Sequence, residues 1–149
     1  CLYLGDSAET TIYETRAGAY DFVTVGKFKL KKDIIVVDLK RINQISPFIE
    51  ELDCLEYAIN KEHLNKINNE MGRIMRRSDS ALDYIPTQYI TDFVKSITHN
   101  EVAEYAGIEY KSVMHENGYN LAIFNPELFE CIDTKIYKID MIDYRKHVM

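Results

Sequence analysis

The sequence has no long apolar run and no surplus of positive charge. No stretch approaches the roughly 20 apolar residues of a membrane-spanning helix, and the first residues, Cys1–Tyr3, do not begin a signal peptide, so no membrane association is expected. The chain has 18 basic and 24 acidic side chains, and its net charge of -6 argues against binding nucleic acid through a basic face. The strongest basic cluster, Arg73–Arg77, is interpreted as a solvated helix end.

Cysteine and histidine are few and widely spaced. Cys1, Cys54 and Cys131 are odd in number and have no CxxC spacing, which indicates reduced thiols in a cytoplasmic protein. No histidine belongs to an HExxH pair, because Tyr119 stands where His115 would need its partner. No GxGxxG or Walker-type loop occurs either. The sequence therefore predicts no bound metal and no nucleotide held in the Rossmann or P-loop manner.

Length and composition indicate one compact domain. The chain has 149 residues, of which 46% are hydrophobic and 28% charged, enough to bury a core and too apolar for disorder. It has no initiator methionine. We therefore expect residues 1–149 to form a single domain that lacks its N-terminal part.

The first elements are predicted to be a short strand and a short helix. Leu2–Leu4 is prone to form a strand, and a helix is expected over 8–16. Asp6 and Glu9 make a plausible capping pair at the start of this helix. Gly18 is expected to end it.

A hairpin is predicted next. Phe22–Leu30 alternates between apolar and polar residues but changes phase at Gly26, which indicates a β-bulge. Ile34–Leu39 is apolar on both faces, as in a central buried strand. The short Lys32–Asp33 connection favours antiparallel pairing of these two segments.

Helices are predicted in the middle of the chain and strands at its end. One or two helices are expected over 47–75 and another over Pro86–Ile97. The last strands are expected at Gly107–Lys111, Tyr119–Phe124 and Glu130–Tyr144. This order predicts an α+β fold, with a mixed β-sheet core flanked by helices, rather than a regular βαβ succession.

Two polar residues could carry chemistry. Glu14 shares a helical face with Thr10 and Thr11, although a Glu in a short helix is usually a solvated side chain. Ser112 follows a strand, where serine is usually a turn or cap residue. No GxSxG motif and no His/Asp partner at a recognisable spacing supports a serine nucleophile. The residues by themselves thus leave a structural role open for both.

A family resemblance rests on blocks near the two ends of the chain. The first is LYLGDSAETTIYETRAGAYDFVTVGKF, and the second comprises YIPTQYI, GIEYKS and GYNLAIFNPELFEC. Together they resemble the RES domain, a family named for an essential Arg, Glu and Ser, whose chemistry is attack on NAD. The resemblance covers most of residues 2–144 and implies a fold like that of ADP-ribosyltransferases.

The resemblance implies roles for five residues. Glu14 matches the catalytic Glu, and Ser112 matches the serine that positions the substrate or the carboxylate. Tyr3 takes the place of the aromatic residue that lines the nicotinamide pocket, although it could be a core tyrosine of a strand. Gln88 and Asn120 fall in matching blocks as substrate-binding residues, with a helix entry and a turn as their structural alternatives.

The family's Arg has no counterpart in this sequence. It should precede the strand that contains Tyr3, ahead of Cys1, and Arg16 occupies a different position. A diphosphate needs charge-assisted donors to bind tightly. We therefore expect the chain as given to turn over NAD more weakly than a longer form with that Arg.

The resemblance implies a bacterial, toxin-like enzyme that releases nicotinamide from NAD. The ribosyl acceptor would be phosphate for an NAD phosphorylase, water for an NAD glycohydrolase or a protein side chain for an ADP-ribosyltransferase. NAD would be the substrate, with phosphate as a possible co-substrate and no cofactor. Expected partners are a cognate antitoxin protein and a second copy in a homo-oligomer. A degenerate, non-catalytic RES module that binds a partner or regulates a larger protein is the alternative, and the codons upstream of Cys1 would discriminate.

Overall fold

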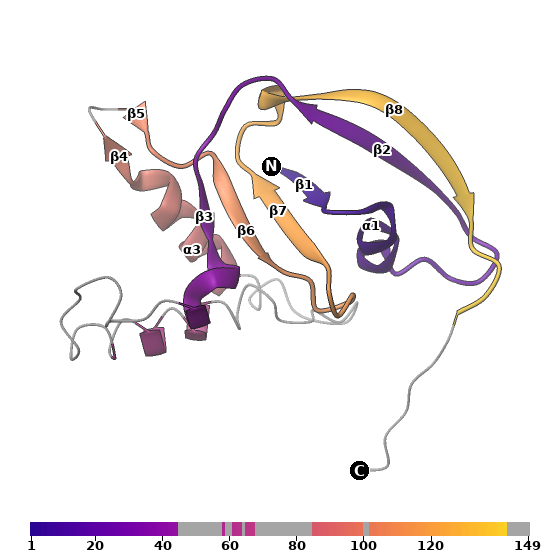
Figure 1. Ribbon diagram of the computed structural model, residues 1–149, viewed down its shortest axis with the longest axis horizontal. Coiled ribbons are helices and arrows are strands. Elements are labelled where there is room, and N and C mark those ends of the chain that lie inside the picture. The colour runs from indigo at the N-terminus through magenta and orange to yellow at the C-terminus, as the bar shows by residue number, and fades with distance from the viewer. Residues whose placement is uncertain (45–57, 59–60, 64, 68–84, 100–101, 143–149) are drawn as a thin grey trace, which may run out of the picture.

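The computed structural model describes residues 1–44, 58, 61–63, 65–67, 85–99 and 102–142 (Figure 1). The predicted helices over 47–75 and the basic cluster Arg73–Arg77 lie largely or wholly outside these residues. Within the described part the α+β class is confirmed. The elements are β1 (Leu2–Gly5), α1 (Ala8–Thr15), β2 (Phe22–Leu30), β3 (Val36–Asp38), the 3₁₀ helix η1 (Leu39–Gln44), α3 (Ile85–Ser96), β4 (Thr98–His99), β5 (Val102–Ala103), β6 (Gly107–Lys111), β7 (Tyr119–Ile123), the 3₁₀ helix η3 (Pro126–Leu128) and β8 (Phe129–Lys138).

A four-stranded mixed sheet forms the centre of the molecule. Its order is β1-β7-β6-β3, in which β7 is antiparallel to both neighbours and β3 is parallel to β6. Ile108 on β6 is 0% exposed and packs with Leu39 and with Val94 of α3. The core therefore lies where α3 and η1 meet β6 and β3 (Figure 1).

A separate two-stranded ribbon is formed by β2 and β8, which are antiparallel. In Figure 1 this ribbon, purple and yellow, arches over β1 and α1. Its register shifts between Lys27 and Phe28. The irregularity predicted near Gly26 from the change of phase is thereby confirmed.

The predicted hairpin of Phe22–Leu30 with Ile34–Leu39 is wrong. β2 pairs with β8 instead, and the backbone N–H of Lys31 still donates to the carbonyl of Leu128, at 2.9 Å. Val36–Asp38 forms β3 at the edge of the sheet, so the prediction of a central strand is also wrong. The residues between β2 and β3 lead the chain from the ribbon to the sheet. The Lys32–Asp33 connection therefore joins strands of two different sheets and does not form a hairpin turn.

The ends of α1 differ from those predicted. Ser7 is the N-cap, and its hydroxyl accepts from the backbone N–H of Thr10 at 3.1 Å. Asp6 accepts from the Thr10 hydroxyl instead, at 2.6 Å. Arg16 is the C-cap in a left-handed conformation with φ 51°, so the helix ends before Gly18.

The later elements follow the sequence pattern closely. α3, β6 and β7 lie within one residue of their predicted bounds. The turn before β7 closes with a hydrogen bond from the Gly118 N–H to the His115 carbonyl, at 3.0 Å. On α3, Val94 is buried but Tyr89 and Phe93 are exposed. The β4–β5 hairpin was not predicted. Among the described residues, no helix combines the length and apolar character needed to cross a membrane.

Candidate active site

The carboxylate of Glu14 is held by two buried donors from the other end of the chain. The hydroxyl of Ser112 and the side-chain amide of Asn120 both donate to Oε1 of Glu14, each at 2.6 Å. Ser112 is 7% exposed and Asn120 is 8% exposed, so both donors are shielded from water. Hydrogen bonds to an ionised carboxylate are about twice as strong as neutral ones. No hydrogen bond from the described residues ends on Oε2, which leaves this oxygen for a bound molecule.

The hydroxyl of Ser112 is fully used. It donates its proton to Glu14, and it accepts the backbone N–H groups of Met114 at 3.2 Å and His115 at 3.0 Å. A hydroxyl has one proton and two acceptor sites, so no capacity is left over. This geometry fits a positioning role for Ser112 and does not fit a nucleophile.

The strand register explains why these residues meet. Asn120 on β7 lies opposite Gly5 on β1 and opposite Tyr110 on β6. Residues directly opposite one another in antiparallel strands share a face of the sheet. Because side chains alternate along a strand, Tyr3 lies on this face as well, and Ser112 continues it beyond the end of β6. The cluster therefore sits on one face of the sheet, where α1 meets β7.

The turn between β6 and β7 contacts the face of α1 that carries Glu14. Thr10 and Glu14 are four residues apart and so lie on one side of the helix. Nδ1 of His115 lies 2.8 Å from Oγ1 of the fully buried Thr10, and the His115 ring stacks on Tyr13 with centroids 5.2 Å apart. A Cβ at Gly118 would lie 2.5 Å from Thr10 Oγ1, so this approach requires glycine. Helix and turn together fix the position of Glu14.

A chain of hydrogen bonds joins the start of α1 to this turn. Thr10 donates its only hydroxyl proton to Asp6, so it must accept from His115, and Nδ1 of that ring carries the proton. Burial raises the pKa of Asp6, but the bonds from Thr10 and from backbone N–H groups, with the charge of His115, outweigh it and leave the pKa below its ordinary value. Asp6 is therefore an ionised anchor of the network at neutral pH.

Tyr110 is the titratable group most affected by this environment. Burial raises the pKa of Tyr110 to about 12, and the charges of Glu14 and Tyr3 act in the same direction. The hydroxyl therefore stays neutral well beyond physiological pH. It adds no second negative charge beside Glu14.

Tyr110→Phe should change how stability depends on pH. The pKa of Tyr110 is higher in the folded protein than in the unfolded chain, so the neutral hydroxyl stabilises the folded state. This contribution is fully present below about pH 10 and is lost as the pH rises through about 12. The variant has no hydroxyl to ionise, so it keeps its stability at high pH. Its free energy of unfolding should therefore rise relative to that of wild type by up to about 2 kcal/mol at high pH. Urea unfolding of both proteins at pH 8 and pH 11.5 measures the change. A constant difference would contradict the assignment.

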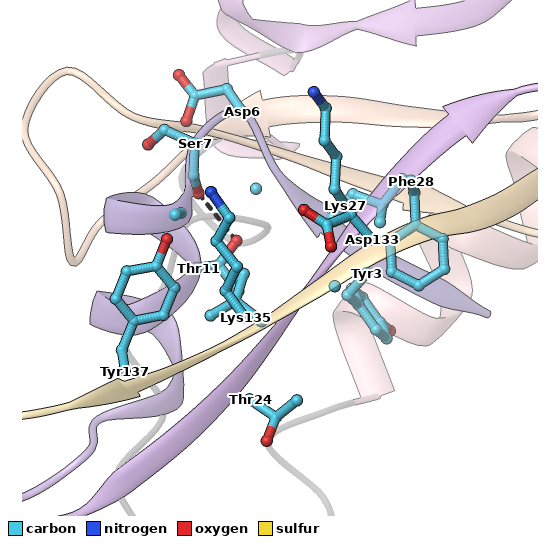
Figure 2. A pocket seen from close by; sticks show the side chains of 15 residues that line it. Tyr3, Asp6, Ser7, Thr11, Thr24, Lys27, Phe28, Asp133, Lys135 and Tyr137 are labelled. Atoms are coloured by element: carbon cyan, nitrogen blue, oxygen red, sulfur yellow. Dashed lines mark hydrogen bonds between the residues drawn. The ribbon is translucent and has the colours of Figure 1, made fainter.

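The other two predicted site residues lie outside the cluster. Tyr3 is 70% exposed and lines a cavity of about 520 Å³ between β1, the start of α1 and the β2–β8 ribbon (Figure 2). Glu14 and Ser112 do not line this cavity. Gln88 is exposed on α3 and has no hydrogen bond to Glu14 among the described residues. The structure thus joins Glu14, Ser112 and Asn120, places Tyr3 on the same sheet face, and gives Gln88 no link to them.

Two residues of the site, Tyr110 and His115, are not predicted from the sequence. Tyr110 precedes Ser112 by two residues and so shares its face, which the sequence pattern indicates. The contact of His115 with Thr10 joins residues far apart in the chain and leaves no local signal. In the part of the chain that the structure describes, no group of three His, Cys, Asp or Glu side chains could hold a metal ion.

Comparison with known proteins gives one match. A family model described as RES domain matches residues 1–142, nearly the whole chain. A search of curated proteins and a search of solved structures found no match.

Proposed function

Because this chain belongs to the RES domain family, we propose that it is an enzyme that cleaves NAD between nicotinamide and ribose. The observation that carries the proposal is the Glu14 carboxylate, held on Oε1 by two buried donors. The same sheet face carries Tyr3, an exposed aromatic ring able to stack on nicotinamide. A fixed carboxylate, at a sheet face that also carries an exposed aromatic ring, suits a reaction that develops positive charge on a sugar.

In this mechanism the bond between C1 of the ribose and the nicotinamide nitrogen breaks, and its electrons return to the pyridine ring. Positive charge then develops on the ribose, as in glycoside cleavage. Glu14 stabilises that charge because its carboxylate is held in place before the reaction. Ser112 and Asn120 keep the carboxylate from turning away, and nicotinamide leaves as a neutral molecule.

The acceptor completes the proposed reaction. Attack by phosphate would form ADP-ribose 1-phosphate, and attack by water would form ADP-ribose and release a proton. Either reaction consumes NAD, which would make the protein toxin-like in a cell and give an antitoxin a reason to block it. Transfer to a protein side chain is the third possibility, and the products distinguish all three.

The products can be identified directly. The protein is incubated with NAD, with and without phosphate, and nicotinamide and the ribosyl product are identified by mass. If water is the acceptor, we expect nicotinamide in both samples. If phosphate is the acceptor, we expect a phosphorylated product that forms only when phosphate is added. Nicotinamide release matched by a mass increase on the protein would favour protein ADP-ribosylation. Unchanged NAD in every sample would contradict the proposal.

Ser112→Ala should reduce turnover less than removal of the carboxylate charge does. The substitution removes one positioning hydrogen bond worth roughly 1 kcal/mol, so kcat should fall about five- to tenfold. It also leaves the backbone N–H groups of Met114 and His115 without their acceptor, which should lower the melting temperature slightly. Ser96→Ala on the exposed face of α3 is the matched control and should leave kcat unchanged. Equal kcat for the two variants would contradict a positioning role.

A further inference from the structure

A polar cavity lies between the sheet edge and the ribbon. It has a volume of about 520 Å³, within the range typical of small-molecule sites. One wall is formed by β1 and the start of α1, with Tyr3, Asp6 and Ser7. The opposite wall is the β2–β8 ribbon, from which Lys27 and Lys135 extend toward the segment with Asp6 and Ser7 (Figure 2). The cavity therefore has cationic groups facing the strand that leads into α1.

A bulge in β8 lies opposite Lys27 and Phe28 on the ribbon wall. Lys27 is opposite Asp133 and Phe28 is opposite Cys131, so the extra residue is Ile132 of β8. Both Lys27 and Phe28 line the cavity. Gly26 makes room for the ring, since a Cβ there would lie 2.9 Å from the ring of Phe28. Lys29, the next residue, does not line the cavity and is exposed.

The two lysines stand close to each other across the ribbon. Lys135 lies opposite Val25, two residues from Lys27, so the two lysines form a diagonal pair. Residues in such a pair are about 7–8 Å apart, a distance within reach of long side chains. Within the described ranges neither lysine forms an ion pair. Two acidic residues share the lining, and each accepts a hydrogen bond elsewhere: Asp6 from Thr10, and Asp133 from the N–H of Thr134, at 2.8 Å. Because neither lysine is held in an ion pair with them, both ammonium groups can turn to an anionic ligand.

The cavity and the Glu14 cluster are linked by the sheet. Tyr3 lines the cavity, and it shares a sheet face with Asn120, which donates to Glu14. A molecule in the cavity that stacks on Tyr3 would therefore contact the sheet face that also carries Asn120.

We propose that this cavity binds the diphosphate of the dinucleotide, with Lys27 and Lys135 as its cationic ligands and Tyr3 and Phe28 as the surfaces that contact its rings. The assignment rests on the proposed function, because NAD is the substrate it serves. Two ammonium groups on one wall match two linked phosphoryl groups. The ribbon then supplies both a cation, Lys27, and an aromatic ring, Phe28, to the binding site.

Binding and turnover test the assignment separately. ADP-ribose, which has the diphosphate but no nicotinamide, is titrated into the protein by calorimetry, and KM for NAD is measured in parallel. Lys27→Gln and Lys135→Gln should each weaken ADP-ribose binding and raise KM about tenfold, with a smaller change in kcat. Asp133→Asn, which removes a negative charge opposite Lys27, should tighten binding several-fold. Lys29→Gln is the control, because Lys29 is an exposed lysine of the same strand that does not line the cavity, and it should change neither quantity.

The outcomes separate this inference from the proposed function. ADP-ribose binding that depends on both lysines, without any nicotinamide release from NAD, would support the subsite and overturn the enzyme. NAD turnover with the same KM in wild type and in the Lys27→Gln, Lys135→Gln double variant would overturn the subsite alone. Equal losses in the Lys29→Gln control would also overturn it, because they would reflect general charge. No ADP-ribose binding and no turnover by the wild-type protein would overturn both.

Discussion

Glu14→Gln should lower the kcat for nicotinamide release by on the order of a hundred- to a thousandfold. Gln keeps the shape of the side chain, and its carbonyl oxygen can still accept from Ser112 and Asn120 as Oε1 of Glu14 does. The fold should therefore persist. What disappears is the negative charge that opposes the developing ribosyl cation.

Steady-state kinetics with NAD measure this loss, and circular dichroism checks the fold. Glu9→Gln is the matched control, since Glu9 is an exposed carboxylate on the same helix without a place in the cluster. Its kcat should equal that of wild type. If Glu14→Gln released nicotinamide at the wild-type rate with unchanged melting, Glu14 would be an ordinary helix residue.

Ile108→Ala should cost about 2–5 kcal/mol in free energy of unfolding, the usual cost of truncating a fully buried large aliphatic side chain. Ile108 lies on β6, packs against Leu39 and Val94, and is the centre of the described core. Removing its side chain leaves a cavity that the packing of Leu39 and Val94 around it cannot close. The loss is a large part of the total stability of a small domain.

Urea unfolding followed by circular dichroism measures the change. Ile136→Ala is the control, because Ile136 is a strand residue of the same type that is 72% exposed on β8. It should lose less than about 1 kcal/mol. Equal losses for the two variants would show that the core does not lie at β6.

Local features of the fold were readable in the sequence. The change of phase at Gly26 predicted an irregularity, which lies between Lys27 and Phe28, and the apolar patterns predicted α3, β6 and β7. Each of these depends on residues that are neighbours along the chain, so each leaves a pattern in a short window.

Pairing between distant segments was not readable. The link between β2 and β3 resembled a turn, but β2 pairs with β8, about a hundred residues later. The cap of α1 shows the same limit on a smaller scale. Asp6 would be a good cap by itself, but its backbone N–H donates to Tyr119 of β7 at 3.0 Å, which extends β1 and leaves Ser7 to cap the helix.

The candidate site could be predicted from the sequence only in part. Spacing on α1 could place Thr10 and Glu14 on one face, but nothing in the residues alone brought Ser112 and Asn120 to that face. The resemblance to the RES domain grouped them, and the strand register gives the physical reason. The roles of all five residues toward a bound molecule stay predictions: Glu14, Ser112, Asn120, Tyr3 and Gln88.

The most direct test of the central claim, that Glu14 supports cleavage of NAD, is a single-turnover measurement. Wild-type protein and the Glu14→Gln variant are each mixed in excess with NAD, and free nicotinamide is followed over time, so that product release does not limit the rate. We predict one equivalent of nicotinamide from wild type and release at least a hundredfold slower, on the order expected for a lost electrostatic contact, from the folded variant. Equal rates in the two proteins, or no nicotinamide from wild type, would contradict the account.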